Sequence, residues 1–181
     1  MKGSMLIRDD KKEDSGRGSK PEQLPREGGT YILIFFCEDA VDLEVGKSGK
    51  ISLRNGFYTY AGSAFGSGGL ASRVGRHVRL VKQKVWHIDY VRPSLRLDEV
   101  WLNTSVSKLE CRWNSHLLEL GGEVVLRKMG SSDCSCSSHF FFHSSRPNSS
   151  DFGSSLVERV TKLSCARQPD GTHAITLSEE K

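Results

Sequence analysis

The stretch from Tyr60 to His77, YAGSAFGSGGLASRVGRH, decides how the rest of the chain is interpreted. Four glycines follow an aromatic-rich segment, which predicts a turn at the end of a strand. From Leu70 to Val81 apolar residues recur at helical spacing, which predicts a helix. Arg73 and His77 lie four residues apart and therefore share a helix face, at the border of the apolar stripe. A tyrosine, an arginine and a histidine converging on one glycine turn suit an anionic, phosphate-bearing substrate.

The segments around this stretch have the periodicity of further strands. Residues 30–37, TYILIFFC, are apolar on both faces, as in a central strand that is covered on both sides. Short alternations at 43–45 and 51–53 predict a small hairpin inserted before residue 57. From residues 57 to 61 the faces differ in chemistry, and Tyr58 shares a face with Tyr60.

The second half of the domain shows the same mixture of patterns. Residues 97–102 predict a strand, and residues 108–120 predict a helix that ends at the glycine pair 121–122. Short strands are expected at 123–126 and 139–143 on either side of a loop rich in serine and cysteine.

Length and composition favour one domain with appended ends. The chain has 181 residues, of which 36% are hydrophobic, enough for a single core. Residues 1–27 are rich in charged residues, glycine, serine and proline and are predicted to be a disordered tail. We expect the domain at 28–144, followed at 145–181 by a linker and a C-terminal extension with a short helix over 156–163.

A group of basic residues follows the glycine turn. Seven lysines and arginines lie between Arg73 and Arg96, against the single acid Asp89, within a chain of formal net charge +4. Such a group is either a solvated face or a surface for a polyanion, and its place beside the glycine turn favours the second alternative. Within this group, Arg76, Arg79, Lys82 and Lys84 are predicted to contact a nucleic acid.

Three motifs occur in the order found in one nuclease superfamily: Gly29-Thr30-Tyr31, Tyr60-Ala61-Gly62, and a helix with Arg73 and His77. The chain therefore resembles the GIY-YIG nucleases, in which two tyrosine-bearing strands and an arginine-bearing helix build one active site. From Gly29 to about His143 it resembles the Uri-type branch, through WHIDY at 86–90, LEC at 109–111 and SSDCSCSSH at 131–139. Thr30 and Ala61 stand where the motif names isoleucine.

The resemblance implies an α/β (α+β) domain with a small central antiparallel sheet flanked by helices. It also implies a divalent-metal-dependent endonuclease that hydrolyses DNA phosphodiester bonds with one Mg²⁺ or Mn²⁺ ion held by Glu110. Arg73 would bind the scissile phosphate, and Tyr31 would act as or position the general base. Tyr60, His77 and His87 would support the water and the phosphate. Uri-type domains are similar to modules fused to repair glycosylases, which suggests DNA repair as a setting.

Each of these residues also has an ordinary structural interpretation. A glutamate in the first turn of a helix is favoured there by the helix dipole, and a strand tyrosine is usually a core residue with a satisfied hydroxyl. A noncatalytic nucleic-acid-binding module with the same fold is therefore the alternative function. A third alternative is a protein-interaction module stabilised by zinc.

The cysteines indicate the cellular compartment and provide candidate ligands for the zinc-stabilised alternative. Five cysteines, an odd number, and no apolar leader in the given sequence predict a reducing, intracellular setting, cytoplasmic or nucleoid-associated, without a membrane. The residue types that zinc prefers recur at Cys134, Cys136 and His139, and Cys111 supplies a fourth. One residue between paired cysteines is unusual spacing for zinc, so thiols packed as small apolar groups remain the other interpretation.

Overall fold

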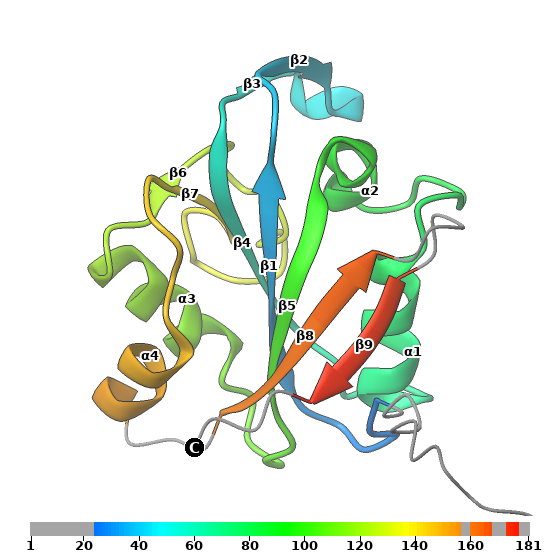
Figure 1. Ribbon diagram of the computed structural model, residues 1–181, viewed down its shortest axis with the longest axis vertical. Helices are drawn as coiled ribbons and strands as arrows, with labels where there is room; N and C mark the ends of the chain where they lie inside the picture. The colour runs from blue at the N-terminus through cyan, green and yellow to red at the C-terminus, as the bar shows by residue number, and fades with distance from the viewer. Residues whose placement is uncertain (1–23, 157–159, 168–172, 178–181) are drawn as a thin grey trace, which may run out of the picture.

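The computed structural model describes residues 24–156, 160–167 and 173–177. Within these residues the chain forms a mixed α/β fold around an antiparallel sheet with the strand order β6-β7-β4-β1-β5-β8-β9 (Figure 1). The strands of the sheet are β1 (Thr30–Cys37), β4 (Gly56–Ser63), β5 (Arg96–Asn103), β6 (Glu123–Val124), β7 (Phe140–His143), β8 (Thr161–Arg167) and β9 (His173–Leu177). The helices are α1 (Gly69–Val78), α2 (His87–Val91), α3 (Glu110–Glu119) and α4 (Ser149–Leu156).

Strand β1 lies in the middle of the sheet, paired with β4 on one side and β5 on the other. Tyr31, Leu33 and Phe35 belong to a core shared with α1 and α2, whereas Ile32 and Ile34 belong to a second core with α3 and α4. Because successive side chains of a strand point to opposite faces, a strand covered on both sides must be apolar throughout. The predicted central strand and the central antiparallel sheet flanked by helices are confirmed.

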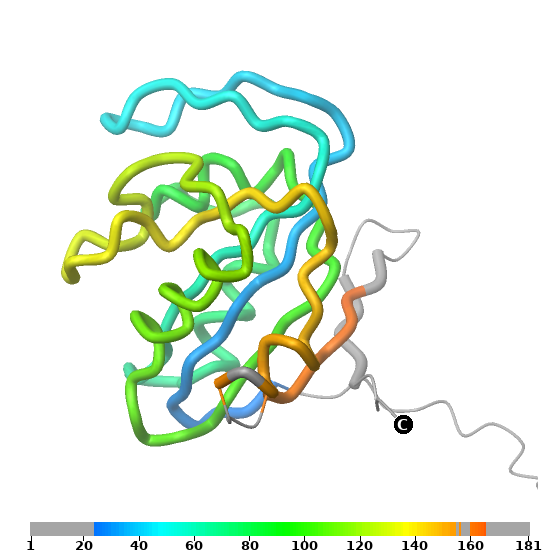
Figure 2. Tube along the Cα trace, turned by 90° about the vertical axis from the view of Figure 1, so that its left-hand side faces the viewer, coloured from blue at the N-terminus to red at the C-terminus, as the bar shows by residue number. Residues whose placement is uncertain are grey.

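The predicted hairpin insertion is also confirmed. Strands β2 (Val41–Glu44) and β3 (Lys50–Leu53) pair with each other in a separate two-stranded sheet. A short 3-10 turn at Gly46–Ser48, η1, connects them. Figures 1 and 2 both show this hairpin beyond one end of the main sheet.

Helix α1 is shorter than the apolar spacing predicts. It ends at Val78, because Arg79 takes an extended backbone conformation, and Val81 is 96% exposed. The buried Arg92 side chain donates to the carbonyl oxygens of His77 at 2.7 Å and Val78 at 3.2 Å. A helix leaves its last carbonyls without intrahelical donors, so the guanidinium satisfies two of them and fixes the end of the helix.

The predicted linker and extension after residue 144 are corrected by the structure. Residues 149–156 form α4, whose Phe152 is fully buried with its ring centroid 5.3 Å from those of Trp101 and Trp113. The chain then forms β8, which pairs with β5, so the helix predicted over 156–163 is wrong. Leu163 lies in a strand because β5 would otherwise present an open edge, and this part of the chain belongs to the domain.

The N-terminal boundary also differs from the prediction. Residues 1–23 of the expected disordered tail lie outside the described residues. Residues 24–27 contact the domain: Leu24 packs on the core, and the backbone N–H groups of Leu70 and Ala71 donate to the carbonyls of Glu27 and Pro25. These bonds satisfy donors in the first turn of α1, so the domain starts by residue 24.

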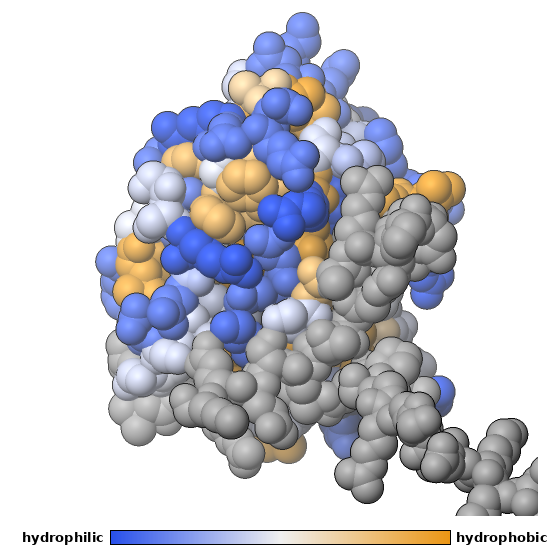
Figure 3. Space-filling view, viewed as in Figure 1, coloured by the Kyte–Doolittle hydropathy of each residue, from blue (hydrophilic) through white to orange (hydrophobic). Residues whose placement is uncertain are grey.

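In the part of the chain that the structure describes, no helix has both the length and the apolar content for crossing a membrane. On the face drawn in Figure 3, outside the grey atoms, hydrophobic residues form separate spots among hydrophilic ones.

Truncation of Phe152 tests whether α4 is part of the core. Phe152→Ala should lower the free energy of unfolding by about 3–5 kcal/mol, because it leaves a cavity between two tryptophans. Val106→Ala is the control, since Val106 is 93% exposed; it should change stability by no more than about 0.5 kcal/mol. Urea unfolding measures both. If the Phe152→Ala protein is as stable as the control, α4 is an appended segment and not part of the core.

Candidate active site

A cavity of about 420 Å³ opens at the end of the sheet where β1 begins and β4 ends. All six residues that the sequence predicts for catalysis line it, although they come from β1, β4, α1, α2 and α3. They are Tyr31, Tyr60, Arg73, His77, His87 and Glu110. The fold therefore brings together one set of side chains that spans 80 residues of sequence, from position 31 to position 110.

The register of β1 and β4 places the two tyrosines on one face. Tyr31 lies opposite Gly62, and Tyr60 lies opposite Leu33, so the tyrosines are diagonal neighbours across the strand pair. A Cβ atom at position 62 would lie 2.4 Å from the Tyr31 hydroxyl oxygen. Gly62 is thus needed because the Tyr31 ring occupies the space of its side chain.

His77 is the buried centre of the cavity wall. Its ring centroid lies 5.8 Å from that of Tyr31, 5.6 Å from that of Tyr60 and 5.4 Å from that of Trp86. Nε2 is hydrogen-bonded to the Tyr31 hydroxyl at 2.9 Å, with a direction set by the histidine tautomer. Nδ1 is buried and has no hydrogen-bond partner among the described residues. Burial lowers the pKa of His77 to about 3, and the nearby Lys82 adds to the effect, so the ring is neutral at physiological pH.

Burial raises the pKa values of the two tyrosines, whereas it lowers that of His77. It raises the pKa of Tyr31 well above its usual value, with the neighbouring Tyr60 as the next cause. It also raises the pKa of Tyr60, to which Glu110 contributes. Both hydroxyls keep their protons at neutral pH and are hydrogen-bonding groups there, not phenolates.

Arg73 enters the cavity from α1 along an aromatic surface. Its Cζ lies 4.6 Å from the centroid of the Trp86 ring, and Arg76 Cζ lies 4.5 Å from it. An arginine over a tryptophan face is held by the ring quadrupole. A second cavity of about 430 Å³, beside the glycine turn, shares Arg73 and Trp86 with the first and is lined also by Arg76 and Arg79. The two cavities therefore adjoin at Arg73 and Trp86, and three arginines line the second one.

Glu110 begins α3 and is fixed from three directions. Thr30 Oγ1 accepts the backbone N–H of Leu109 at 3.1 Å, which ties the start of the helix to β1. Ser63 Oγ donates to Glu110 Oε2 at 2.6 Å, and His139 Nδ1 lies 3.0 Å from Oε1. The Glu110 side chain is 23% exposed and faces the cavity. Each carboxylate oxygen keeps a lone pair for a further contact.

His87 connects the hairpin insertion to the cavity. It is the first residue of α2, and its Nε2 is hydrogen-bonded to Ser48 Oγ, in η1, at 3.0 Å. The insertion therefore helps to position a residue of the cavity wall, a role that its alternating sequence did not indicate.

The four predicted DNA-contacting residues have two different roles. Arg79 and Lys84 are exposed, as expected for a surface that meets a polyanion. Arg76 and Lys82 pair with the buried carboxylate of Asp89 at 2.5 and 3.0 Å. The prediction that Lys82 faces DNA is corrected, because its side chain is almost fully buried against Asp89. Arg76 combines this pairing with a place in the second cavity.

Asp89 organises the loop between α1 and α2. Burial by itself would raise the pKa of Asp89, but the backbone N–H groups of Val85 and Trp86 and the ammonium of Lys82 hold it below its usual value. The two N–H groups lie 3.0 Å from Oδ2. The Asp89 carboxylate therefore fixes the position of Trp86, and the Arg73 guanidinium packs against the Trp86 ring.

The four candidate zinc ligands also lie together. The ligand atoms of Cys111, Cys134, Cys136 and His139 are all within 4.8 Å of one another. Cys111 is an exposed residue of α3, and the loop that carries the other three residues packs next to it. This cluster lies directly behind Glu110, since His139 contacts both Cys134 and Glu110.

Comparison with known families assigns the chain to one of them. A family model described as a domain of unknown function, DUF123, matches residues 30–162. The chain belongs to the DUF123 family. The match runs past residue 144 into β8, in agreement with α4 being part of the domain. Searches of curated proteins and of solved structures give no match.

In this DUF123 chain, sequence reasoning gave no role to several residues that line the cavity. Ser63 holds Glu110, Trp86 supports Arg73, and Gly130 and Asp133 line the cavity. Gly130 has φ +78°, and a Cβ there would lie 2.9 Å from the Tyr60 ring. Trp86 could have been identified from the sequence, because it is adjacent to the candidate residue His87. Ser63 and Asp133 carry no such signal, because their roles depend on tertiary contacts alone.

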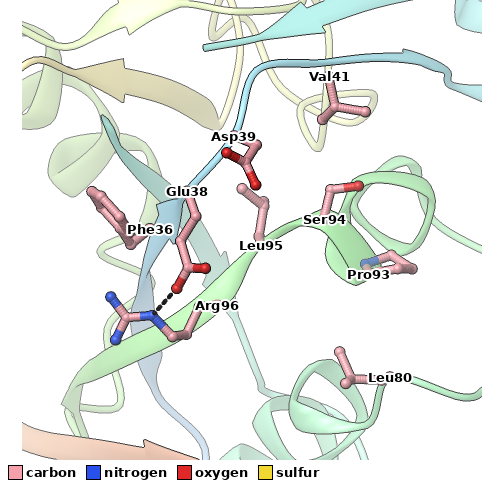
Figure 4. Close-up of a pocket in the computed structure, with 9 residues that line it drawn as sticks. All are labelled: Phe36, Glu38, Asp39, Val41, Leu80, Pro93, Ser94, Leu95 and Arg96. Carbon is pink, nitrogen blue, oxygen red and sulfur yellow. Dashed lines mark ion pairs between the residues drawn. The ribbon is translucent and has the colours of Figure 1, made fainter. Parts of the chain in front are cut away.

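The DUF123 domain has a further cavity of about 290 Å³, between the end of β1 and the start of β5 (Figure 4). Its polar residues are Glu38, Asp39, Ser94 and Arg96, and Glu38 pairs with Arg96 at 3.4 Å. None of the residues predicted for the active site lines this cavity. It therefore has no part in the candidate active site.

The neutral state of His77 predicts how stability depends on pH. The folded-state pKa of about 3 lies below the ordinary value of 6.5, so the unfolded chain binds more protons between these values. Stability should therefore fall on acidification below pH 6.5, by about 1.4 kcal/mol per pH unit for this group.

His77→Phe should be less sensitive to pH by that amount, whereas Val106→Ala, an exposed position without a titrating group, should keep the wild-type slope. Urea unfolding between pH 7 and pH 4 measures the difference. Because the buried His143, with a pKa lowered to about 4 by burial, is present in every variant, the comparison isolates His77. Identical slopes for wild type and His77→Phe would contradict burial of a neutral ring.

Proposed function

We propose that this DUF123 chain is a metal-dependent endonuclease of the GIY-YIG type that hydrolyses phosphodiester bonds of DNA. The observation that carries the proposal is the convergence of Tyr31, Tyr60, Arg73, His77 and Glu110 on one cavity. Their order along the chain resembles that of the superfamily motifs, and the cavity supplies what phosphodiester hydrolysis needs: a cation for the phosphate, hydrogen-bonding groups for water, and a carboxylate.

Arg73 binds the scissile phosphate in this proposal. Its guanidinium lies at the junction of the two cavities and is supported by Trp86. A planar guanidinium donates two parallel hydrogen bonds to a phosphate, so a fixed arginine both binds the group and orients it. The charge that builds on the phosphoryl oxygens during attack strengthens this contact in the transition state.

Tyr31 and His77 position the attacking water. The protonated Tyr31 hydroxyl faces the cavity and is hydrogen-bonded to the neutral His77 ring. Since the pKa of Tyr31 is raised by burial, this pair orients water through its hydrogen bonds and does not hold a phenolate at rest. Water attacks phosphorus while the P–O bond to the leaving group breaks; the proton that the water loses passes through the Tyr31 hydroxyl to bulk solvent, and the leaving oxygen takes up a proton from solvent. The Tyr60 hydroxyl also lines the cavity and is available as a hydrogen-bond donor to the phosphate.

Glu110 would hold the single Mg²⁺ or Mn²⁺ ion, with Asp133 on the same cavity wall. The donor set fits a hard cation, which takes carboxylate oxygens together with water and substrate phosphate. When bound, such an ion polarises the phosphoryl group and supplies a nucleophilic water. The ties from Ser63 and His139 keep the carboxylate in one orientation without using all of its lone pairs.

In this proposal the DNA strand lies along the second cavity, beside the glycine turn. Arg76 and Arg79 line it together with Arg73, so phosphates adjacent to the scissile one meet further cations. Such contacts bind DNA of any sequence and release counterions. The nucleic acid class rests on the resemblance, and parallel assays on DNA and RNA of the same sequence decide it.

Substitution of Glu110 tests the proposed metal ligand. Glu110→Gln keeps the shape of the side chain but removes the charge that a hard cation requires, so nicking in Mg²⁺ should fall by about 100-fold or more. DNA affinity should be kept, because the carboxylate does not attract phosphate. Glu119→Gln, on the same helix and exposed, should cleave at the wild-type rate.

The assay uses plasmid together with flaps, bubbles and abasic sites, with and without Mg²⁺. Cleavage by Glu110→Gln at the wild-type rate would refute the metal assignment. Binding without Mg²⁺-dependent cleavage in the wild type would favour the noncatalytic nucleic-acid-binding module.

Replacement of arginine by lysine separates a geometric role from a charge role. Arg73→Lys keeps the charge but loses the planar fork and its stacking on Trp86, so kcat should fall by roughly 100-fold. The control, Arg79→Lys, keeps an exposed phosphate contact and should be nearly as active as wild type. Arg79→Ala should instead reduce the slope of log affinity against log salt by about 1. An active Arg73→Lys enzyme would mean that charge alone is required.

A further inference from the structure

The loop from 130 to 139 has two sides with different chemistry. Gly130, Ser132 and Asp133 line the candidate active site. Cys134, Cys136 and His139 face Cys111 on α3 instead. The loop therefore separates the cavity from a cluster of three thiols and one imidazole, which the proposed nuclease chemistry does not use.

The dimensions of this cluster are those of a zinc site. In a tetrahedral site with Zn–S bonds of about 2.3 Å, neighbouring ligand atoms lie about 3.7 Å apart. Here the Cys134 Sγ atom lies 3.3 Å from His139 Nε2, and all four ligand atoms are within 4.8 Å of one another. Three cysteines and one histidine form one of the common ligand sets of structural zinc.

Two side chains hold the loop in place by donating hydrogen bonds to its backbone carbonyls. Asn114, one turn after Cys111, donates from Nδ2 to the Ser138 carbonyl at 2.7 Å. Lys128 Nζ donates to the carbonyls of Cys134 and Cys136 at 3.1 and 3.2 Å. The unusual Cys-x-Cys spacing is accommodated because the third and fourth ligands come from the end of the loop and from a separate helix.

We propose that Cys111, Cys134, Cys136 and His139 bind one structural zinc ion, and that His139 connects this ion to Glu110. Nε2 of His139 faces the thiols, and Nδ1 lies 3.0 Å from Glu110 Oε1. A zinc-bound histidine commonly places its second nitrogen against a carboxylate, which fixes the ring and the carboxylate together. Zinc thus holds the Asp133-bearing wall and the orientation of Glu110 at once.

Zinc content and stability test the site without any assay of cleavage. Full-length wild type and Cys165→Ser, whose thiol lies on β8 outside the cluster, should each contain about one zinc per chain. The Cys134→Ser/Cys136→Ser double variant should contain none and melt about 10 °C lower. A wild type without zinc after expression in zinc-supplemented medium would overturn the proposal, as would a double variant with unchanged zinc content.

A cobalt spectrum covers the case in which the double variant does not fold. Wild-type protein is stripped with a chelator and titrated with Co²⁺. The intense visible bands of tetrahedral cobalt, together with thiolate charge-transfer absorption, support the site. A spectrum without thiolate charge transfer refutes it.

His139→Cys tests the connection to Glu110, and this part rests on the proposed function. A fourth cysteine keeps the ligand number for zinc but removes the contact with the carboxylate. Zinc content should remain about one per chain, while Mn²⁺ affinity, measured by titration of the zinc-loaded protein, should fall about 10-fold. If the variant retains zinc and its Mn²⁺ affinity is unchanged, the role of zinc is limited to folding. If the nuclease proposal fails, the zinc measurements are unaffected.

Discussion

The close approach of Tyr31 to Gly62 across β1 and β4 is the constraint on which the site depends. The tyrosine ring occupies the space of a missing side chain, so the strand pair admits only glycine at this position. In that place its hydroxyl reaches His77 on α1, which fixes the helix relative to the sheet. Arg73 lies one turn earlier on the same helix, and its position in the cavity follows.

The opposite side of the cavity depends on Glu110 in a similar way. Thr30, next to Tyr31 on β1, accepts the N–H of Leu109 and so ties α3 to the same strand. Thr30 thus has a structural role in this chain, because its hydroxyl satisfies a helix donor that would otherwise lack one. One strand therefore positions both Tyr31 in the cavity and the helix that carries Glu110.

Much of this arrangement was predictable from the sequence because it rests on local patterns. The two-sided apolar run of β1 and the alternation in β4 are properties of single segments, and the hairpin follows from two short alternations. The ends of α1 and the fate of residues after 144 were not predictable in this way. Arg92 ends α1 from 14 or 15 residues away, and β8 exists because β5 has an edge to pair.

The electrostatic roles show the same limit. A count of charges between Arg73 and Arg96 cannot distinguish Arg79, which is exposed, from Lys82, which pairs with a buried carboxylate. Likewise, Cys111 joins the loop cysteines only through the packing of that loop on α3. Long-range contacts decide these roles, and single-segment patterns do not contain them.

The central claim is that one cavity holds both a divalent cation and the phosphate of a nucleic acid. Anomalous diffraction at the manganese edge, from crystals with Mn²⁺ and a non-hydrolysable DNA analogue, tests it most directly. The account predicts one manganese peak bound by Glu110, with a DNA phosphate against Arg73 and the Tyr31 hydroxyl facing the phosphorus from the opposite side. DNA bound away from this cavity, or manganese bound without Glu110, would contradict it.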